Sequence, residues 1–246
     1  MHRQTIAELQ DRLSMVNRTF RQPAIVSGFP VIWQTAFPEA EIFPDQDTLE
    51  VTPNSCDLVI HAMALHWAND LVGQLIQCRR ALQPDGLFLA ACFGGQTLIE
   101  LRAALAEAEI EITGGLSPRI APMAEIRDLG GLLQRAGFAL PVADSARLTV
   151  TYRSARHLMH ELRAMGENNA LANRLRHPTK AAVLRRTEEI YNARHRRDDG
   201  TIAATFEMIY LTGWAPDPSQ PKPLRPGSAV TRLSAALKTQ ENPLKD

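Results

Sequence analysis

Apolar residues gather in short continuous runs that are separated by segments of helical period. Residues 24–28 (AIVSG), 56–64 (CDLVIHAMA) and 87–93 (LFLAACF) are almost wholly apolar, which is typical of strands covered on both faces. Between the last two runs, Asn69 or Asp70 can cap a helix that carries one apolar stripe. Strand, capped helix and strand form a βαβ unit, so we expect parallel strands joined by a right-handed crossover.

The same periods predict the remaining elements. Helices are expected at 1–22, 30–37, 71–82, 97–108, 122–136, 154–166 and 179–195, and further strands at 40–43, 147–152 and 204–214. Pro84-Asp85-Gly86 is expected to stop the helix at 71–82. This order predicts a mostly parallel α/β sheet with a helical insertion before its last strand. We divide the chain into an N-terminal helix (1–22), a Rossmann-like core (23–152), a helical insertion (153–200), the last core strand (201–214) and a proline-rich extended tail (215–246).

Composition narrows the class of protein. The 27 Lys+Arg and 27 Asp+Glu of the 246 residues balance, which argues against a general nucleic-acid binder. No apolar run approaches the roughly 18 residues of a membrane span, and the polar start lacks a signal-peptide core. Three cysteines without a CxxC pair support neither a disulfide framework nor a zinc site. We therefore expect a protein of the bacterial cytoplasm.

Residues 57–102 resemble the second half of a class I S-adenosylmethionine methyltransferase domain. Residues 114–138, 165–171 (MGENNAL) and 225–229 (RPGSA) are similar to the family of mitochondrial NADH dehydrogenase (complex I) assembly factors of methyltransferase fold and their alphaproteobacterial relatives. The resemblance implies a class I sheet whose last strand is antiparallel. It also implies a protein substrate, a subunit of the respiratory NADH dehydrogenase, and either methyl transfer or the protein arginine hydroxylation described for that family.

The resemblance further implies an S-adenosylmethionine site at the carboxyl ends of the strands. Gly28 would begin the cofactor turn, or it simply ends a strand. Asp45 would face the adenine amino group and Asp47 would contact the ribose, the alternative being solvated turn acids. His61 would line the same pocket.

The front of the domain is shorter than the family pattern. Ser27-Gly28-Phe29-Pro30 has one glycine where the family has a glycine-rich turn. Ala24 and Asp45 are 45 − 24 = 21 residues apart, whereas two crossovers with their strands need well over about thirty. We therefore expect one strand and one helix to be missing, together with the acid that binds the ribose.

Candidate substrate-side residues follow the central strand. His66 can act as a general base, or His66 and Trp67 pack beneath a covering segment. Arg119, after a Gly-Gly pair, can bind a carboxylate or an acidic peptide, or it is merely exposed. His157 and His160 lie on one predicted helix, but the absence of HxD and HxE patterns leads us to expect no metal site.

Positive charge concentrates in the predicted insertion. Ten basic residues lie between positions 174 and 197: Arg174, Arg176, His177, Lys180, Arg185, Arg186, Arg194, His195, Arg196 and Arg197. They form either a solvated helix face or a surface that docks an acidic protein. Two functions stay open: an enzyme acting on a protein, and a non-catalytic assembly chaperone that has lost its cofactor. In both, any membrane contact is expected to be peripheral and through the partner.

Overall fold

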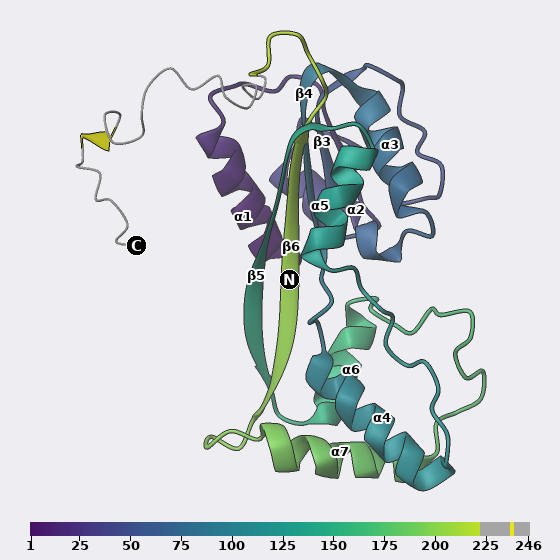
Figure 1. Cartoon of the computed structure of the whole chain (residues 1–246). Helices are drawn as coiled ribbons and strands as arrows, with labels where there is room; N and C mark the ends of the chain where they lie inside the picture. Colours follow the sequence, from purple (N-terminus) through teal and green to yellow (C-terminus); the bar gives the residue numbers. More distant parts are fainter. Residues whose placement is uncertain (222–236, 239–246) are drawn as a thin grey trace, which may run out of the picture. The chain divides into compact units, whose positions relative to one another are not determined.

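The computed structural model describes residues 1–221 and 237–238, of which Met1–Pro216 form one compact unit. Its centre is a six-stranded sheet with the order β2-β1-β3-β4-β6-β5 (Figure 1). The strands are β1 (Pro23–Val26), β2 (Glu41–Phe43), β3 (Cys56–Ala62), β4 (Leu82–Phe93), β5 (Ala139–Tyr152) and β6 (Ile202–Trp214). β2, β1, β3 and β4 pair in parallel, and β6 is antiparallel to both of its neighbours. The predicted Rossmann-like sheet with an antiparallel last strand is confirmed.

Helices cover both faces of the sheet. They are α1 (His2–Met15), α2 (Pro30–Ala36), α3 (Leu71–Ala81), α4 (Ile99–Thr113), α5 (Ile126–Arg135), α6 (Ala155–Ala164) and α7 (Ala181–His195), with a 3₁₀ turn η1 (Leu65–Trp67). Alternate strand residues point to opposite faces, so Val59 packs with α3 and α5 whereas Ile60 packs with the other helices. Both faces are therefore apolar, which explains the continuous apolar runs.

Caps that the sequence contains fix several helix ends. The Asp70 carboxylate accepts a hydrogen bond from the Gly73 amide at the start of α3. The Ser154 hydroxyl accepts one from the His157 amide at the start of α6. Gly114 ends α4 with a φ of 73°, a left-handed conformation that favours glycine.

Five predicted boundaries are wrong by four residues or more. Helix α4 ends at Thr113 instead of 108, and α5 begins at Ile126 instead of 122. The helix expected over 1–22 ends at Met15, because the Asp57 carboxylate takes the amides of Arg21 and Gln22 and holds that segment extended. Strand β5 begins at Ala139 instead of 147. The turn expected at 84–86 lies inside β4, where a register shift against β3 accommodates it.

The last two strands are long and pair from Ala139 and Trp214 to Tyr152 and Ile202. Helices α6 and α7 lie between them in sequence, and α4 packs against α7 beyond the end of the sheet (Figure 1). None of the helices in residues 1–221 has the length and apolarity needed to cross a membrane. Most of the extended tail predicted for 215–246 lies outside the described residues.

Candidate functional site

The carboxyl ends of the parallel strands bring Gly28, Asp45 and His61 to one edge of the sheet. Asp45 comes two residues after β2, and a Cβ added at Gly28 would lie 3.0 Å from its Oδ1 and 3.2 Å from its Oδ2. The Asp45 carboxylate is exposed and accepts no hydrogen bond within residues 1–221. Asp45 follows the strand beside β1, so it is itself a candidate for the ribose acid that was expected to be missing. Within the described sheet, the strand that would lie beyond β2 is the absent one.

His61 lies beneath this edge as a buried, neutral imidazole. Burial lowers the pKa of His61 to about 4, and its Nε2 lies 3.3 Å from Gln74 Oε1. Its Nδ1 is buried without a partner in the described chain. Gln74 also donates to the carbonyl oxygens of Gln46 and Asp47, so α3 fixes the loop that carries the two acids. The Asp47 side chain itself accepts a hydrogen bond from Asn69 at 3.2 Å, on the surface.

Aromatic rings cover the turn after β1. The Phe29 ring is 41% exposed, and its centroid lies 4.6 Å from that of His2 in α1. A Cβ added at Gly166 would lie 3.3 Å from the tip of the same ring. The edge thus fits the ribose of a nucleoside cofactor at Asp45, because a carboxylate can accept both hydroxyls. At the methionine end, the half-exposed Phe29 ring lies where the family has the open backbone of a glycine-rich turn.

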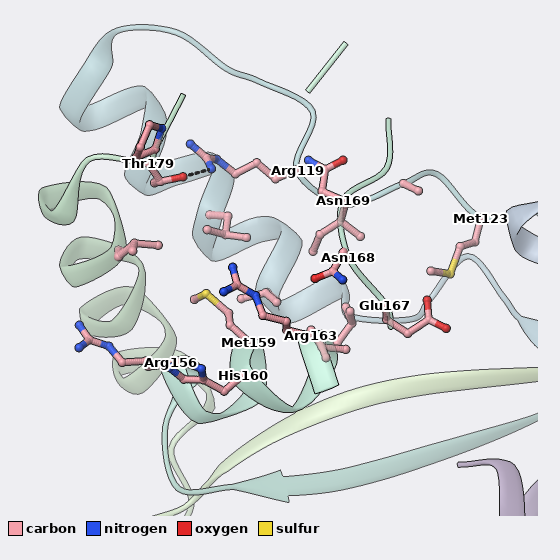
Figure 2. A pocket seen from close by; sticks show the side chains of 18 of the residues that line it. Arg119, Met123, Arg156, Met159, His160, Arg163, Glu167, Asn168, Asn169 and Thr179 are labelled. Atoms are coloured by element: carbon pink, nitrogen blue, oxygen red, sulfur yellow. Dashed lines mark hydrogen bonds between the residues drawn. The ribbon is translucent and has the colours of Figure 1, made fainter. Parts of the chain in front are cut away.

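A cavity of about 790 Å³ lies beside this edge, among η1, α4, α6 and α7. His66 and Trp67 are among its lining residues. Two loops, at 119–123 and 167–169, form other parts of its wall (Figure 2). Gly28, Asp45, Asp47 and His61 are not among its lining residues. The structure therefore separates the residues expected to bind the cofactor from those expected on the substrate side.

His66 packs against two aromatic rings and also lines this cavity. Its side chain is only 4% exposed, and its ring lies 4.9 Å from the Phe93 ring and 5.7 Å from the Trp67 ring, centroid to centroid. Its Nε2 lies 3.2 Å from Glu167 Oε1, and its Nδ1 is buried without a partner in the described residues. Glu167 therefore orients the imidazole at the cavity wall.

Arg119 binds a carboxylate of its own chain. Its Nε and Nη2 donate to the two oxygens of Glu109 in α4 at 3.0 and 2.7 Å, and its Nη1 donates to Thr179 at 2.9 Å. Burial alone would raise the pKa of Glu109, but the hydrogen bonds from Arg119 and Ser117 outweigh it and lower the pKa to about 2. Arg119 is thus neither exposed nor free to take a carboxylate from a ligand.

Helix α6 contributes cavity residues that the sequence analysis missed or interpreted differently. Arg156, Met159, His160 and Arg163 all line the cavity (Figure 2). Their spacing of three and four places them on one helix face, a signal that the sequence contained. His157 instead lies 3.7 Å from Glu161, and the described residues contain no group of three His, Cys, Asp or Glu that could hold a metal ion.

Two basic residues of α7 are paired within the chain. Arg186 bonds Glu111 and Glu189, and Arg194 bonds Glu107. Arg185 is exposed and has no partner in the described residues. The basic insertion is therefore partly neutralised by α4.

Comparisons with known proteins agree with the fold. The family profile described as "Methyltransferase domain" matches residues 35–90. The chain is 41% identical over 190 residues to "Arginine-hydroxylase NDUFAF5, mitochondrial" of Dictyostelium discoideum, covering 77% of this chain and 44% of that protein. It is 33% identical to "Malonyl-[acyl-carrier protein] O-methyltransferase" of Gallionella capsiferriformans, covering 84% and 68%. A solved chain from Bacillus halodurans C-125, assigned as a methyltransferase, superposes with a TM-score of 0.52 at 13% identity, covering 86% of this chain and 99% of that chain.

The chain spans only part of its mitochondrial relatives. Against five arginine-hydroxylase NDUFAF5 proteins, to which it is 39% to 41% identical, it covers 44% to 60% of their length. Those relatives include the mouse and human proteins.

Proposed function

Because the chain belongs to the class I S-adenosylmethionine-dependent methyltransferase family, we propose that it acts on a protein substrate in the assembly of the respiratory NADH dehydrogenase. One observation carries this proposal. The segments that resemble the assembly-factor family, 114–138 and 165–171, are far apart in sequence, yet both contribute walls to the same cavity beside His66. A shared family sequence that converges on one cavity is what a common substrate site requires. We place this activity in the bacterial cytoplasm, with any membrane contact made through the partner.

The cofactor of this proposal is S-adenosylmethionine, which supplies a methyl group on a sulfonium when it is bound. In place of the adenine contact that the resemblance implied for it, Asp45 would accept the ribose hydroxyls above Gly28, with Asp47 in the same loop and His61 beneath it. The Asp45 carboxylate supports this role because it is exposed and has no partner in the described residues.

Calorimetric titration with S-adenosylmethionine and with its demethylated product tests the cofactor site. We expect micromolar binding that Asp45→Asn abolishes and Glu50→Gln preserves, since Glu50 is an exposed acid near the end of the same loop. If the wild-type protein binds neither compound up to millimolar concentration, the cofactor assignment is wrong.

On the substrate side, we assign His66 as the base that faces a reacting group, with its ring oriented by Glu167. Trp67 supplies an apolar wall, and Arg119 holds the 117–119 loop against α4 as a positioning residue. No metal ion is part of the proposal. Replacing His66 by Gln should lower turnover more than substrate affinity, because Gln retains a hydrogen-bond partner for Glu167 but cannot take up a proton.

A second function is a non-catalytic assembly chaperone. The Phe29 ring in the cofactor turn and the absent outer strand favour it. NADH dehydrogenase assembly in cells separates the two functions: a chaperone tolerates Asp45→Asn but not a charge reversal at the cavity, such as Arg163→Glu. An enzyme tolerates neither change. If both variants assemble the complex normally, neither function uses these sites.

A further inference from the structure

Glu167 is the single acid that lines the cavity of about 790 Å³, among the residues that the structure describes. Its position is fixed by the way α6 ends. Gly166 has a φ of 84° and its amide donates to the Arg163 carbonyl oxygen, while the Glu167 amide donates to the Leu162 carbonyl oxygen. These two bonds form a Schellman motif, so the backbone determines where the carboxylate meets the cavity.

The two carboxylate oxygens of Glu167 differ in their surroundings. Oε1 lies 3.2 Å from His66 Nε2. Oε2 has no hydrogen-bond partner in the described chain, and it keeps contact with solvent, unlike the fully shielded His66 Nδ1. The side chain as a whole is only 16% exposed. An accessible acceptor is therefore left over at the cavity wall.

No permanent cation balances the charge of Glu167. Its ion-pair partner within the described residues is His66, an imidazole that is charged only when protonated. His2 of α1 also lies within electrostatic reach, but burial lowers the pKa of His2 although the Glu167 carboxylate raises it, so His2 is neutral at pH 7. Arg119 is bound to Glu109. A partly shielded carboxylate without a counterion is unfavourable, and a cationic ligand group relieves it.

The unpaired cations of the cavity lie away from Glu167. Figure 2 shows Arg156 and His160 toward one end of the cavity, and Glu167 with Met123 toward the other. Arg163 extends its guanidinium away from Glu167 in the same view. The cavity thus has a cationic end and an anionic end, and a cationic ligand group is attracted only to the second.

Aromatic rings at the anionic end favour a guanidinium over an ammonium ion. Trp67 lines the cavity, and its ring centroid lies 5.7 Å from that of His66, the ring that Glu167 contacts. A guanidinium is planar, is less strongly hydrated than an ammonium ion and stacks on aromatic faces. It also forms strong charge-assisted hydrogen bonds with a carboxylate.

We propose that Glu167 is a specificity-determining residue, which accepts an arginine side chain of the substrate protein on Oε2 while its Oε1 holds His66. One carboxylate then places the substrate side chain beside the imidazole that we assign as the base. The inference rests on the proposed protein substrate and adds the residue that selects its side chain.

Calorimetry on the full chain with three synthetic peptides tests this inference. The peptides share one sequence of leucine, serine and glycine and differ at a single central position, which is arginine, lysine or citrulline. Citrulline has nearly the shape of arginine but carries no charge. We expect the arginine peptide to bind at least about tenfold more tightly than the citrulline peptide at low salt, and more tightly than the lysine peptide.

Two glutamine variants separate Glu167 from general charge. Glu167→Gln should weaken the arginine peptide at least about tenfold and leave the citrulline peptide within about twofold, whereas a merely structural role would weaken all three peptides alike. Glu161→Gln removes the same charge from an exposed acid of α6 outside the cavity and should keep the preference for arginine.

Three results overturn the inference: no peptide binds up to millimolar concentration, the wild type does not distinguish arginine from citrulline, or Glu167→Gln keeps the preference. The peptides probe side-chain selection without any NADH dehydrogenase subunit. The inference and the proposed role in assembly can therefore fail separately.

Discussion

Glu109→Gln removes the carboxylate that joins the 117–119 loop to α4, and we expect a large loss of stability. The Glu109 side chain is 4% exposed and accepts hydrogen bonds from the Ser117 amide, the Ser117 hydroxyl and two nitrogens of Arg119. Glutamine turns an NH₂ group toward these donors and leaves the Arg119 charge without its counterion. Breaking a buried ion pair in this way costs about 3–5 kcal/mol.

The pKa of Glu109 gives an independent magnitude with a defined sign. Lowering this pKa from 4.5 to about 2 corresponds to roughly 3 kcal/mol. The unfolded chain takes up the proton first as the pH falls, so the contribution is complete well above pH 4.5 and is lost toward pH 2. At pH 3.5, one unit below the unfolded value, about 1.4 kcal/mol of it should be gone.

Urea unfolding followed by tryptophan fluorescence measures both quantities. We expect Glu109→Gln to cost about 3 kcal/mol at pH 7 and about 1.4 kcal/mol less at pH 3.5. Glu111→Gln, on the same helix, is the matched control, because its ion pair with Arg186 is exposed to solvent and its loss should cost far less than the loss of the buried pair. Equal losses in the two variants, or a Glu109→Gln cost independent of pH, would refute the reasoning.

Three further predictions follow from buried or crowded groups. Arg102→Met should raise the melting temperature by about 2–4 °C in calorimetry, because it removes two shielded unpaired nitrogens while a third keeps solvent contact; an unchanged or lower value contradicts this. His61→Leu should abolish the loss of stability between pH 6.5 and about 4 seen in urea titrations of the wild type, since the unfolded histidine binds its proton first; an unchanged pH profile argues against a buried neutral imidazole. Gly94→Ala should destabilise by about 1–3 kcal/mol, because its Cβ would lie 2.6 Å from the Ile209 side chain. Gly131→Ala in α5 meets nothing within 4 Å and should stabilise by about 0.4–1 kcal/mol, so equal effects of the two alanines in urea unfolding refute the packing argument.

The sheet could be predicted because its information is local. Strands buried on both faces need continuous apolar residues, and β3 and the paired part of β4 show this directly in their sequences. The end of α1 could not be predicted, because the Asp57 carboxylate that captures the amides of Arg21 and Gln22 is some 36 residues away in sequence. The spacing of apolar residues along one helix carries no information about a contact with such a distant residue.

Some residues of the candidate site could likewise be predicted from the sequence, and others could not. His66 and Trp67 could be placed because they directly follow a predictable strand. The partner of Arg119 could not, since it depends on how the 117–119 loop folds back on α4. The number of residues between Ala24 and Asp45 correctly indicated that the N-terminal half of the sheet is short of one strand. The position of Asp45 beside Gly28 depends on the pairing of β1 with β2, which the sequence of either strand alone does not specify.

The pairing of Tyr152 with Ile202 has a consequence for how this fold can change. Directly opposed residues of antiparallel strands are only about 4.5–5.5 Å apart at their Cα atoms. The segment between them, which includes α6 and α7, therefore starts and ends at neighbouring positions of the sheet. The length of this segment can therefore change without a change in the pairing register of β5 and β6.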